Sequence, residues 1–416
     1  MSVLHRLADT SRVRLGQALG VLTSYSMITL SKAQDAVSVH RLVQAVTLAD
    51  LPDDQYQAVR AKAVDLLSAS LPDDPETIDS WATYQQLLAH ARAALPPHSP
   101  AMGKMIEYLH ASGDYTTAAA LQHNRHQALL HSQGPEHPDT LVALAGFAYY
   151  TGMAGDAVTA RDHFTALLPL FKRVFGDEHP RTLEVWGELG AWTGFAGDEA
   201  KALNLFIALL PVRERVLGAE HPDTLNDRSN IARLTGELGD EASARDQFVA
   251  LLLIRERVRG AEHPSTLIDR DNLAFCTGAA GDAAGARDQY TALLPIRERV
   301  SGPEHPETLT TRHNLAYWLG ETGDAARARD QYIALLPISE RVSGPEHADT
   351  LAVRFNLARW SGEAGDAAGA RDQLAALLPI SERVSGPEHP DTLTTRHELT
   401  YWTDRCRKTD AEGPAL

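Results

Sequence analysis

Histidine is the residue type whose spacing most suggests chemistry in this 416-residue sequence. The string His-Pro-x-Thr-Leu, with Ala348 replacing proline in one copy, recurs every 42 residues. Its histidines are His137, His179, His221, His263, His305, His347 and His389. Imidazoles bind zinc when several meet at one ion. Packed helices lie about 8–10 Å apart, so histidines one repeat apart are too distant to share an ion. We predict a structural role in a loop and no metal site.

Catalytic motifs are absent from the sequence. There is no HExxH, no Gly-x-Ser-x-Gly and no Gly-x-x-x-x-Gly-Lys-Ser/Thr phosphate loop. The denser group His123, His126 and His131 shares a helix face only at His123 and His126, which favours a solvated surface. Carboxylates are abundant, but they recur with the repeat, as structural residues do. We therefore predict that the chain is not an enzyme and needs no cofactor.

Composition limits the kind of partner. Hydrophobic residues make up 44% of the chain and charged residues 23%, which predicts a folded protein. The net charge of -16 disfavours nucleic acid as a partner. No run approaches about 18 apolar residues, so we predict no membrane contact. Two cysteines, Cys276 and Cys406, are too few for a disulfide framework and fit a cytoplasmic protein.

The elements that carry these residues are paired helices. A second anchor, Gly-Asp, recurs in the same 42-residue register. In the unit that begins at His305, the first helix is predicted over residues 306–319, with proline at its first position. Asp324 is the predicted N-cap of a second helix that ends near Val342. Pro337 inside that helix predicts a gentle kink, and Leu253 at the matching position predicts a straighter helix. Such pairs stack into a solenoid.

The helix-pair signature Leu315-Ala316, Gly323-Asp324, Ala328 and Tyr332 resembles the tetratricopeptide repeat, and the 42-residue period resembles its kinesin-light-chain type. The resemblance covers residues 99–405. It implies an all-α, right-handed superhelical solenoid of antiparallel helix pairs. The last unit stops after one helix, and we predict that this half-unit caps the C-terminal end of the solenoid. Arg407-Lys408 replace Gly-Asp there, so we predict a polar tail over 406–416.

The first hundred residues lack the period. Helices at 15–22 and 41–46 and strands at 26–30 and 36–40 predict a small winged-helix-like remnant over 1–50, followed by a helical spacer over 51–98. The string at 37–46, and Leu87-Leu88-Ala89-His90 further on, resemble the segments that precede tetratricopeptide repeats in bacterial NB-ARC proteins of the STAND class of NTPases. Because the phosphate loop is absent, the chain resembles only the C-terminal half of such proteins, the winged-helix remnant plus the repeats, without the nucleotide-binding part.

An asparagine ladder runs along the first helices. Its members are Asn230, Asn272, Asn314 and Asn356. The family resemblance implies that such asparagines line a concave groove and hydrogen-bond the backbone of an extended peptide, because an amide both donates and accepts. The alternative is a structural asparagine that bonds a neighbouring helix. Arginines two residues earlier (Arg228, Arg270, Arg312, Arg354 and Arg396) are predicted to pair with repeat carboxylates.

Two positions vary among otherwise similar repeats. The first variable set is Ser229, Asp271, His313, Phe355 and His397. The second variable set is Arg233, Phe275, Tyr317, Arg359 and Tyr401. Aromatic and arginine side chains are frequent interface anchors. We predict the binding patch on the central units, from Arg233 to Arg359, with Phe275, His313, Tyr317 and Phe355 between them.

These features favour a scaffold or sensor arm that binds a protein or extended peptide in bacterial signalling or regulation. The first alternative is the ligand-sensing half of a split STAND-type NTPase whose nucleotide-binding part lies on another chain. The second alternative is a DNA-binding regulator, which the acidic charge disfavours. The oligomeric state is left open.

Overall fold

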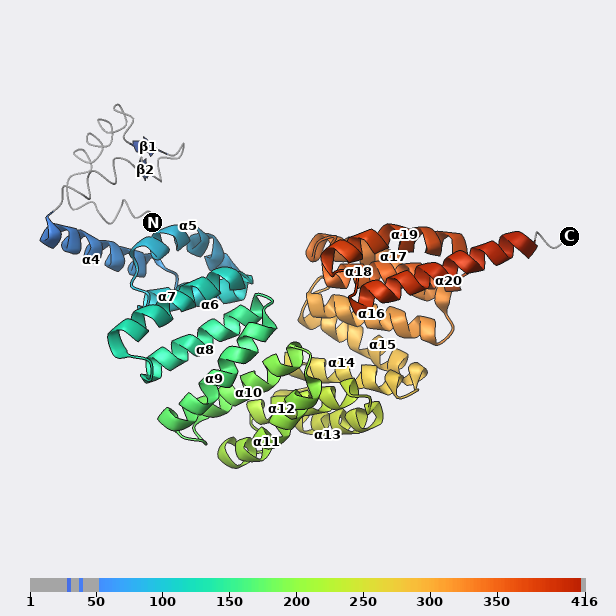
Figure 1. Ribbon diagram of the computed structural model, residues 1–416, viewed down its shortest axis with the longest axis horizontal. Helices are drawn as coiled ribbons and strands as arrows, with labels where there is room; N and C mark the ends of the chain where they lie inside the picture. Colours follow the sequence, from blue (N-terminus) through green and yellow to red (C-terminus); the bar gives the residue numbers. More distant parts are fainter. Residues whose placement is uncertain (1–27, 31–36, 40–51, 413–416) are drawn as a thin grey trace. The chain divides into compact units, whose positions relative to one another are not determined.

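The computed structural model describes residues 28–30, 37–39 and 52–412 (Figure 1). The chain divides into two compact units, unit 1 from Met1 to Glu188 and unit 2 from Leu189 to Leu416. The division falls inside one helix, α10 (Pro180–Phe195). No helix in these described ranges is long and apolar enough to cross a membrane.

The predicted hairpin is present in unit 1. Strands β1 (Ile28–Leu30) and β2 (Val37–Val39) pair antiparallel, with Ile28 opposite Val39. The helices predicted at 15–22 and 41–46 lie outside the described residues. The predicted spacer consists of two helices, α4 (Asp53–Ser70) and α5 (Ile78–Ala94).

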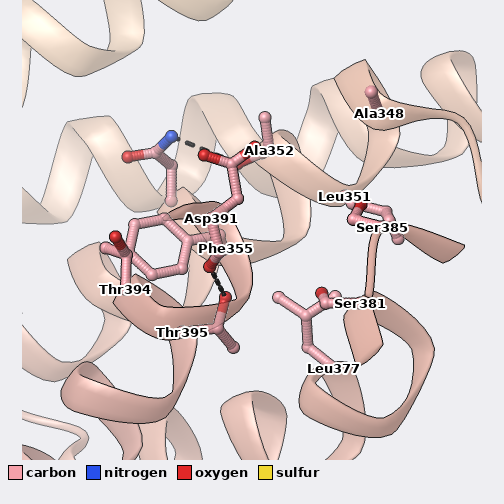
Figure 2. A pocket seen from close by; sticks show the side chains of 11 residues that line it. Ala348, Leu351, Ala352, Phe355, Leu377, Ser381, Ser385, Asp391, Thr394 and Thr395 are labelled. Carbon is pink, nitrogen blue, oxygen red and sulfur yellow. Dashed lines mark hydrogen bonds between the residues drawn. The ribbon is translucent and has the colours of Figure 1, made fainter. Parts of the chain in front are cut away.

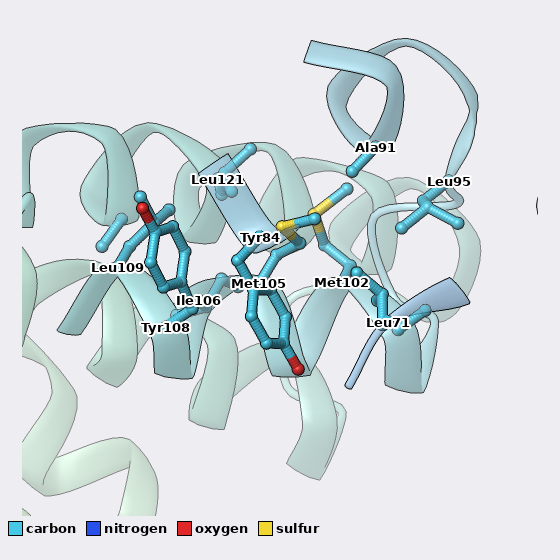
Figure 3. Close-up of a cluster of buried hydrophobic side chains, with 12 residues drawn as sticks. Leu71, Tyr84, Ala91, Leu95, Met102, Met105, Ile106, Tyr108, Leu109 and Leu121 are labelled. Atoms are coloured by element: carbon cyan, nitrogen blue, oxygen red, sulfur yellow. The ribbon is translucent and has the colours of Figure 1, made fainter. Parts of the chain in front are cut away.

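The spacer packs on the first repeat. Tyr84 of α5 stacks on Tyr108, with ring centroids 5.1 Å apart, and its hydroxyl donates to the backbone oxygen of Pro72. Figure 3 shows these rings beside Met102 and Met105 in one buried apolar cluster. Because burial of such a cluster is the main source of stability, the spacer and the first repeat form one core.

Paired helices make up the rest of the chain, as predicted. Unit 1 continues with α6 (Pro100–Ser112), α7 (Tyr115–Gln133), α8 (Pro138–Met153), α9 (Ala157–Phe175) and the start of α10. Unit 2 continues with α11 (Glu199–Leu217), α12 (Pro222–Glu237), α13 (Glu241–Arg259), α14 (Pro264–Ala279), α15 (Ala283–Val300), α16 (Pro306–Glu321), α17 (Ala325–Val342), α18 (Ala348–Glu363), α19 (Ala367–Val384) and α20 (Pro390–Glu412). Within unit 2, each helix from α11 on packs against the next one in sequence, which is the arrangement of an all-α solenoid of helix pairs.

The recurring histidine caps the first helix of its repeat. In α16, His305 is the N-cap, and its Nδ1 accepts a hydrogen bond from the backbone N–H of Glu307 at 3.3 Å. The same bond recurs at the other six copies, with distances of 3.2–3.3 Å. The histidines therefore satisfy orphan helix N–H groups, and no group of three or more metal-ligand side chains occurs in the described residues.

Loss of one histidine cap is expected to cost about 0.5–2 kcal/mol of unfolding free energy, the usual range for N-caps. His305→Ala should show this loss in urea denaturation, because the backbone N–H of Glu307 loses its acceptor. His305→Asn is the matched control, since a short amide oxygen can accept the same bond. Equal stability of the alanine variant and wild type would contradict the capping role.

The second helix of each pair begins at the recurring aspartate. Asp324 accepts a hydrogen bond from the backbone N–H of Arg327, as predicted for an N-cap. The helix then runs unbroken through Pro337, which is exposed. The glycine before the aspartate, Gly323, has φ of +92°, a conformation that L side chains rarely adopt.

The last helix extends into the stretch 406–416 that was predicted as a polar tail. Helix α20 continues from Pro390 to Glu412 rather than ending before a tail at 406. Arg407 and Lys408 stand where earlier units have Gly-Asp. Without the glycine that adopts positive φ and the aspartate that caps a new helix, nothing ends the first helix, so it extends.

Candidate interaction surface

The first helices of unit 2 form a continuous surface, which we call the first-helix face. Each of α12, α14, α16 and α18 contacts the first helix of the next unit, the last of these contacts being with α20. Both variable sets lie on these helices at i, i+4 spacing, so they fall on one stripe of each helix. On α14 this stripe carries Phe275, which is 51% exposed, and Ile268, which is 40% exposed. An exposed large apolar pair on one stripe is a feature of interfaces.

Aromatic and arginine side chains of neighbouring repeats contact each other on this face. The Phe275 ring lies edge-on to Trp318, with centroids 6.3 Å apart. Tyr317 lies edge-on to Trp360, at 6.2 Å. The Arg359 guanidinium lies 5.8 Å from the Tyr317 ring and 4.7 Å from the Trp360 ring. These contacts hold the second variable set in place before any partner binds, which lowers the entropy cost of binding.

Arginines of the second variable set also pair with carboxylates. Arg359 donates to Glu321 at 3.0 Å, and Arg233 donates to Glu237 at 2.6 Å. Both arginines remain partly exposed.

Two members of the asparagine ladder use their amide groups within the protein. Asn314 Nδ2 donates to Asp271 Oδ2 at 3.3 Å and to the Tyr290 hydroxyl at 3.1 Å. Asn356 is buried, and its Nδ2 donates to the backbone oxygen of Ala352 at 3.1 Å. Asn314 therefore bonds neighbouring helices, which is the structural alternative, whereas this bond of Asn356 stays within its own helix. Asn230 and Asn272 are half-buried.

The first variable set varies in burial as well as in type. His313 packs edge-on to Tyr332 and lies 3.4 Å from Asn356 Nδ2, and burial lowers the pKa of its imidazole to about 4. His313 is therefore neutral at physiological pH and serves the contact between α16 and α18.

The arginine ladder pairs with repeat carboxylates as predicted, for example Arg270 with Glu256 at 2.6 Å.

A column of buried ion pairs lies beneath the first-helix face. Arg213 of α11 contacts Asp227 of α12 at 2.6 Å. Arg255 of α13 contacts Asp269 of α14 at 2.7 Å, and the two side chains are only 3% and 1% exposed. Ser229 of the preceding first helix also donates to Asp269. Each pair joins a second helix to the next first helix, so it sets the register between repeats.

In the next repeat, the position of Asp227 and Asp269 is held by Thr311 rather than by an aspartate. Arg297 contacts Glu307, and Asp271 fills the adjoining space by accepting from Thr311 at 3.0 Å. The hydroxyl of Tyr290 donates to the backbone oxygen of Asp271 at 2.9 Å. The matching second-helix positions further on are Ser339 and Ser381. The polar residues buried between neighbouring repeats therefore differ from one repeat to the next.

The column makes stability depend on pH. Burial raises the pKa of Asp227 to about 7, although Arg213 opposes this shift. The unfolded carboxyl titrates near 3.8, so the folded state binds more protons between these values and loses stability as pH rises through them. We expect the unfolding free energy to fall by on the order of 1 kcal/mol from about pH 5 to about pH 7.5. Burial also raises the pKa of Asp269, to about 6, which adds to the slope.

Denaturation at several pH values measures this slope. Asp227→Asn should make the slope shallower, because an amide does not titrate. The exposed variant Asp246→Asn should leave it unchanged. A slope that is the same in wild type and in Asp227→Asn would contradict the assignment.

A cavity lies between α18, α19 and α20, where Ser381 holds the repeat position that is arginine earlier in the chain. Ser381, Phe355 and Thr395 line a space of about 230 Å³ (Figure 2). Thr395 donates to the backbone oxygen of Asp391. Ser381 stands at the position of Arg255, so a long side chain that fills the earlier interface is replaced here by a short one. A larger cavity, of about 570 Å³, lies within unit 1 between α7, α8, α9 and α10.

Sequence reasoning missed the ion-pair column and Ile268. Arg213, Arg255 and Arg297 recur at one position of the second helices, and Asp227 and Asp269 recur at one position of the first helices. The available signal was that a basic and an acidic residue occur together in successive repeats and that both are replaced later in the chain.

Comparison with known families identifies the repeats. Two family models, each described as a tetratricopeptide repeat, match residues 187–223 and 225–265, and residues 270–336 and 315–382. No curated protein matches the chain by sequence. The repeats between residues 187 and 382 are therefore tetratricopeptide repeats.

Solved structures share this fold. A STAND protein with a tetratricopeptide repeat sensor from Pyrococcus horikoshii is 11% identical, with a TM-score of 0.53. The match covers 92% of this chain and 54% of that chain, so this chain spans about half of that protein. The apo form of RapI is 12% identical, with a TM-score of 0.51 and coverage of 71% and 96%.

A further similar structure contains the nearly identical TPR-like repeats of a putative kinesin light chain from Podospora anserina. It is 25% identical, with a TM-score of 0.42 and coverage of 50% of this chain and 98% of that chain. These neighbours are what the chain is similar to. Tetratricopeptide repeats form scaffolds that are typical of protein interaction.

Proposed function

We propose that this chain is a non-enzymatic scaffold or sensor arm whose first-helix face binds an extended peptide or a segment of a protein. The observation that carries the proposal is the exposed stripe of the second variable set. Phe275, Tyr317 and Arg359 differ among repeats that are otherwise alike, and their side chains are held by neighbouring rings. Aromatic and arginine side chains that vary along a partly exposed stripe are the pattern expected of a specificity surface.

The proposed contacts follow from side-chain chemistry. Phe275 and Ile268 supply apolar area, Arg233 and Arg359 supply charge and planar stacking, and the half-buried Asn272 supplies an amide toward a peptide backbone, as does Asn230. Asn314, Asn356, His313 and Phe355 then act as positioning residues, because their contacts lie between repeats or around the cavity at α19.

A second candidate function is the sensor half of a STAND-type system in bacterial signalling, with the nucleotide-binding part on another chain. The neighbour from Pyrococcus horikoshii, whose repeats are named a sensor, supports it at the level of fold. A nucleotide-binding STAND chain that co-purifies with this one would favour this candidate over an independent scaffold. In either case the same face contacts the partner, in the cytoplasm.

Affinity capture with matched variants tests the proposal. The face variant Phe275→Ser, Tyr317→Ser, Arg359→Ala should lose captured partners by at least about tenfold, the usual effect of removing interface anchors. The control variant Val249→Ser, Leu253→Ser, Ile333→Ser removes exposed apolar side chains from the second helices instead. Circular dichroism verifies that both variants fold. Equal capture by the face variant and wild type would contradict the proposal.

A further inference from the structure

The cavity in unit 1 has a lining that differs from the first-helix face of unit 2. Its volume is about 570 Å³, within the range of roughly 300–1,000 Å³ typical of ligand sites. Phe164 and Phe171 of α9 and Val185 of α10 form a buried apolar floor. Gln122, Tyr149, Glu184 and Glu188 line the remainder with polar atoms.

Small residues on α8 open this cavity. Ala145 and Gly146 occupy the positions of the first variable set and of the asparagine ladder. A Cβ at Gly146 would lie 2.7 Å from Gln122 Nε2, so a larger residue here would displace the glutamine amide from its present position. The amide oxygen of Gln122 is buried and has no hydrogen-bond partner among the described residues. A buried acceptor without a partner is costly, and a ligand donor would satisfy it.

Charge and aromatic character select the ligand. Glu184 and Glu188 place two carboxylates on one side of the cavity, against one cation, Arg181, whose guanidinium lies 5.8 Å from the Phe175 ring. The Tyr149 ring on the wall packs edge-on to Tyr150 at 5.3 Å. Burial, and then the charge of Glu188, raises the pKa of Tyr149, which keeps its hydroxyl protonated. Carboxylates together with an aromatic face are the surroundings that bind guanidinium or ammonium groups.

We propose that this cavity binds the guanidinium group of an arginine side chain presented by a peptide or protein partner. Glu184 and Glu188 accept its N–H groups, the Gln122 oxygen accepts a further one, Tyr149 offers its ring, and the apolar floor takes the methylene stem. The overall charge of -16 favours approach of such a cationic partner. The proposal deepens the proposed function, on which it rests, but it concerns unit 1 and so is tested by different residues.

The test is saturation-transfer NMR on the full chain, with N-acetylarginine methylamide as the probe. The neutral isostere N-acetylcitrulline methylamide has nearly the same shape without the charge. We expect the arginine compound to bind with a millimolar dissociation constant and the citrulline compound at least about tenfold more weakly. Glu184→Gln with Glu188→Gln should lower arginine binding to the citrulline level. Glu363→Gln with Glu388→Gln, which removes the same charge from exposed sites in unit 2, should leave binding unchanged.

Three results would overturn the proposal: no transfer to either compound, equal binding of both compounds, or undiminished arginine binding by the Glu184 and Glu188 double variant. A hexapeptide, acetyl-Gly-Ser-Arg-Gly-Ser-Gly-amide, distinguishes the source of the guanidinium. Tighter binding of the hexapeptide than of the single residue supports a peptide partner. Equal binding would assign the cavity to a free guanidinium compound and overturn the peptide assignment. None of these results depends on Phe275, Tyr317 or Arg359, so failure here is separate from failure of the first-helix face.

Discussion

Arg255→Ala is expected to lower the free energy of unfolding by about 3–5 kcal/mol, the range for breaking a buried ion pair by removing one partner. The Arg255 and Asp269 side chains are 3% and 1% exposed and lie 2.7 Å apart. Without the guanidinium, the Asp269 carboxylate would be left buried, with Ser229 as its remaining partner. Urea denaturation followed by circular dichroism measures the change.

Two controls separate charge burial from loss of packing. The double change Arg255→Met with Asp269→Leu removes both charges and keeps apolar volume, so it should restore most of the lost stability. Arg257→Ala, on the same helix, removes an exposed pair with Glu220 and should cost much less stability than Arg255→Ala. Equal losses for Arg255→Ala and Arg257→Ala would show that the buried column does not stabilise the stacking of repeats.

Gly320→Ala is expected to destabilise the chain by about 1–3 kcal/mol, the usual effect of overpacking a core. Alanine normally favours a helix over glycine by about 1 kcal/mol, so the sign is reversed here. A Cβ at Gly320 would lie 2.5 Å from the Trp360 ring of the next repeat. The same contact recurs between Gly278 and Trp318 and between Gly362 and Trp402. Denaturation experiments measure the change in unfolding free energy.

Gly103→Ala is the matched control for this substitution. Gly103 lies within α6, and a Cβ there would meet nothing within 4 Å. That variant should gain about 0.5–1 kcal/mol from helix propensity. A Gly320→Ala variant as stable as Gly103→Ala would mean that Trp360 can move aside without cost.

Repeat architecture was predictable from the sequence because two anchors fix each helix boundary. The histidine and the aspartate each cap a helix, and the glycine before the aspartate adopts positive φ, so boundaries in the unit at His305 fell within two residues of the structure. Boundary prediction failed at α20, where those anchors are missing. The tight fit of Trp360 on Gly320 was not predicted, because it joins residues 40 positions apart.

The candidate surface was only partly predictable. Its two variable sets stand out because the rest of the repeat is nearly constant. Whether a polar side chain faces a partner or a neighbouring repeat depends on packing between helices, which a single sequence does not encode locally. Asn314 and Asn272 hold the same repeat position, yet Asn314 bonds Asp271 and Tyr290 only because both of those side chains occur one repeat earlier.

Site-specific photo-crosslinking tests the central claim most directly. Benzoylphenylalanine would replace Phe275, 51% exposed on the first-helix face, or Ile333, 54% exposed on a second helix. Irradiation in an extract of the source organism, followed by electrophoresis and mass spectrometry, reports which surface a partner touches. We predict a discrete adduct from position 275 and none from position 333. An adduct from position 333 alone, or from neither position, would contradict a binding site on the first-helix face.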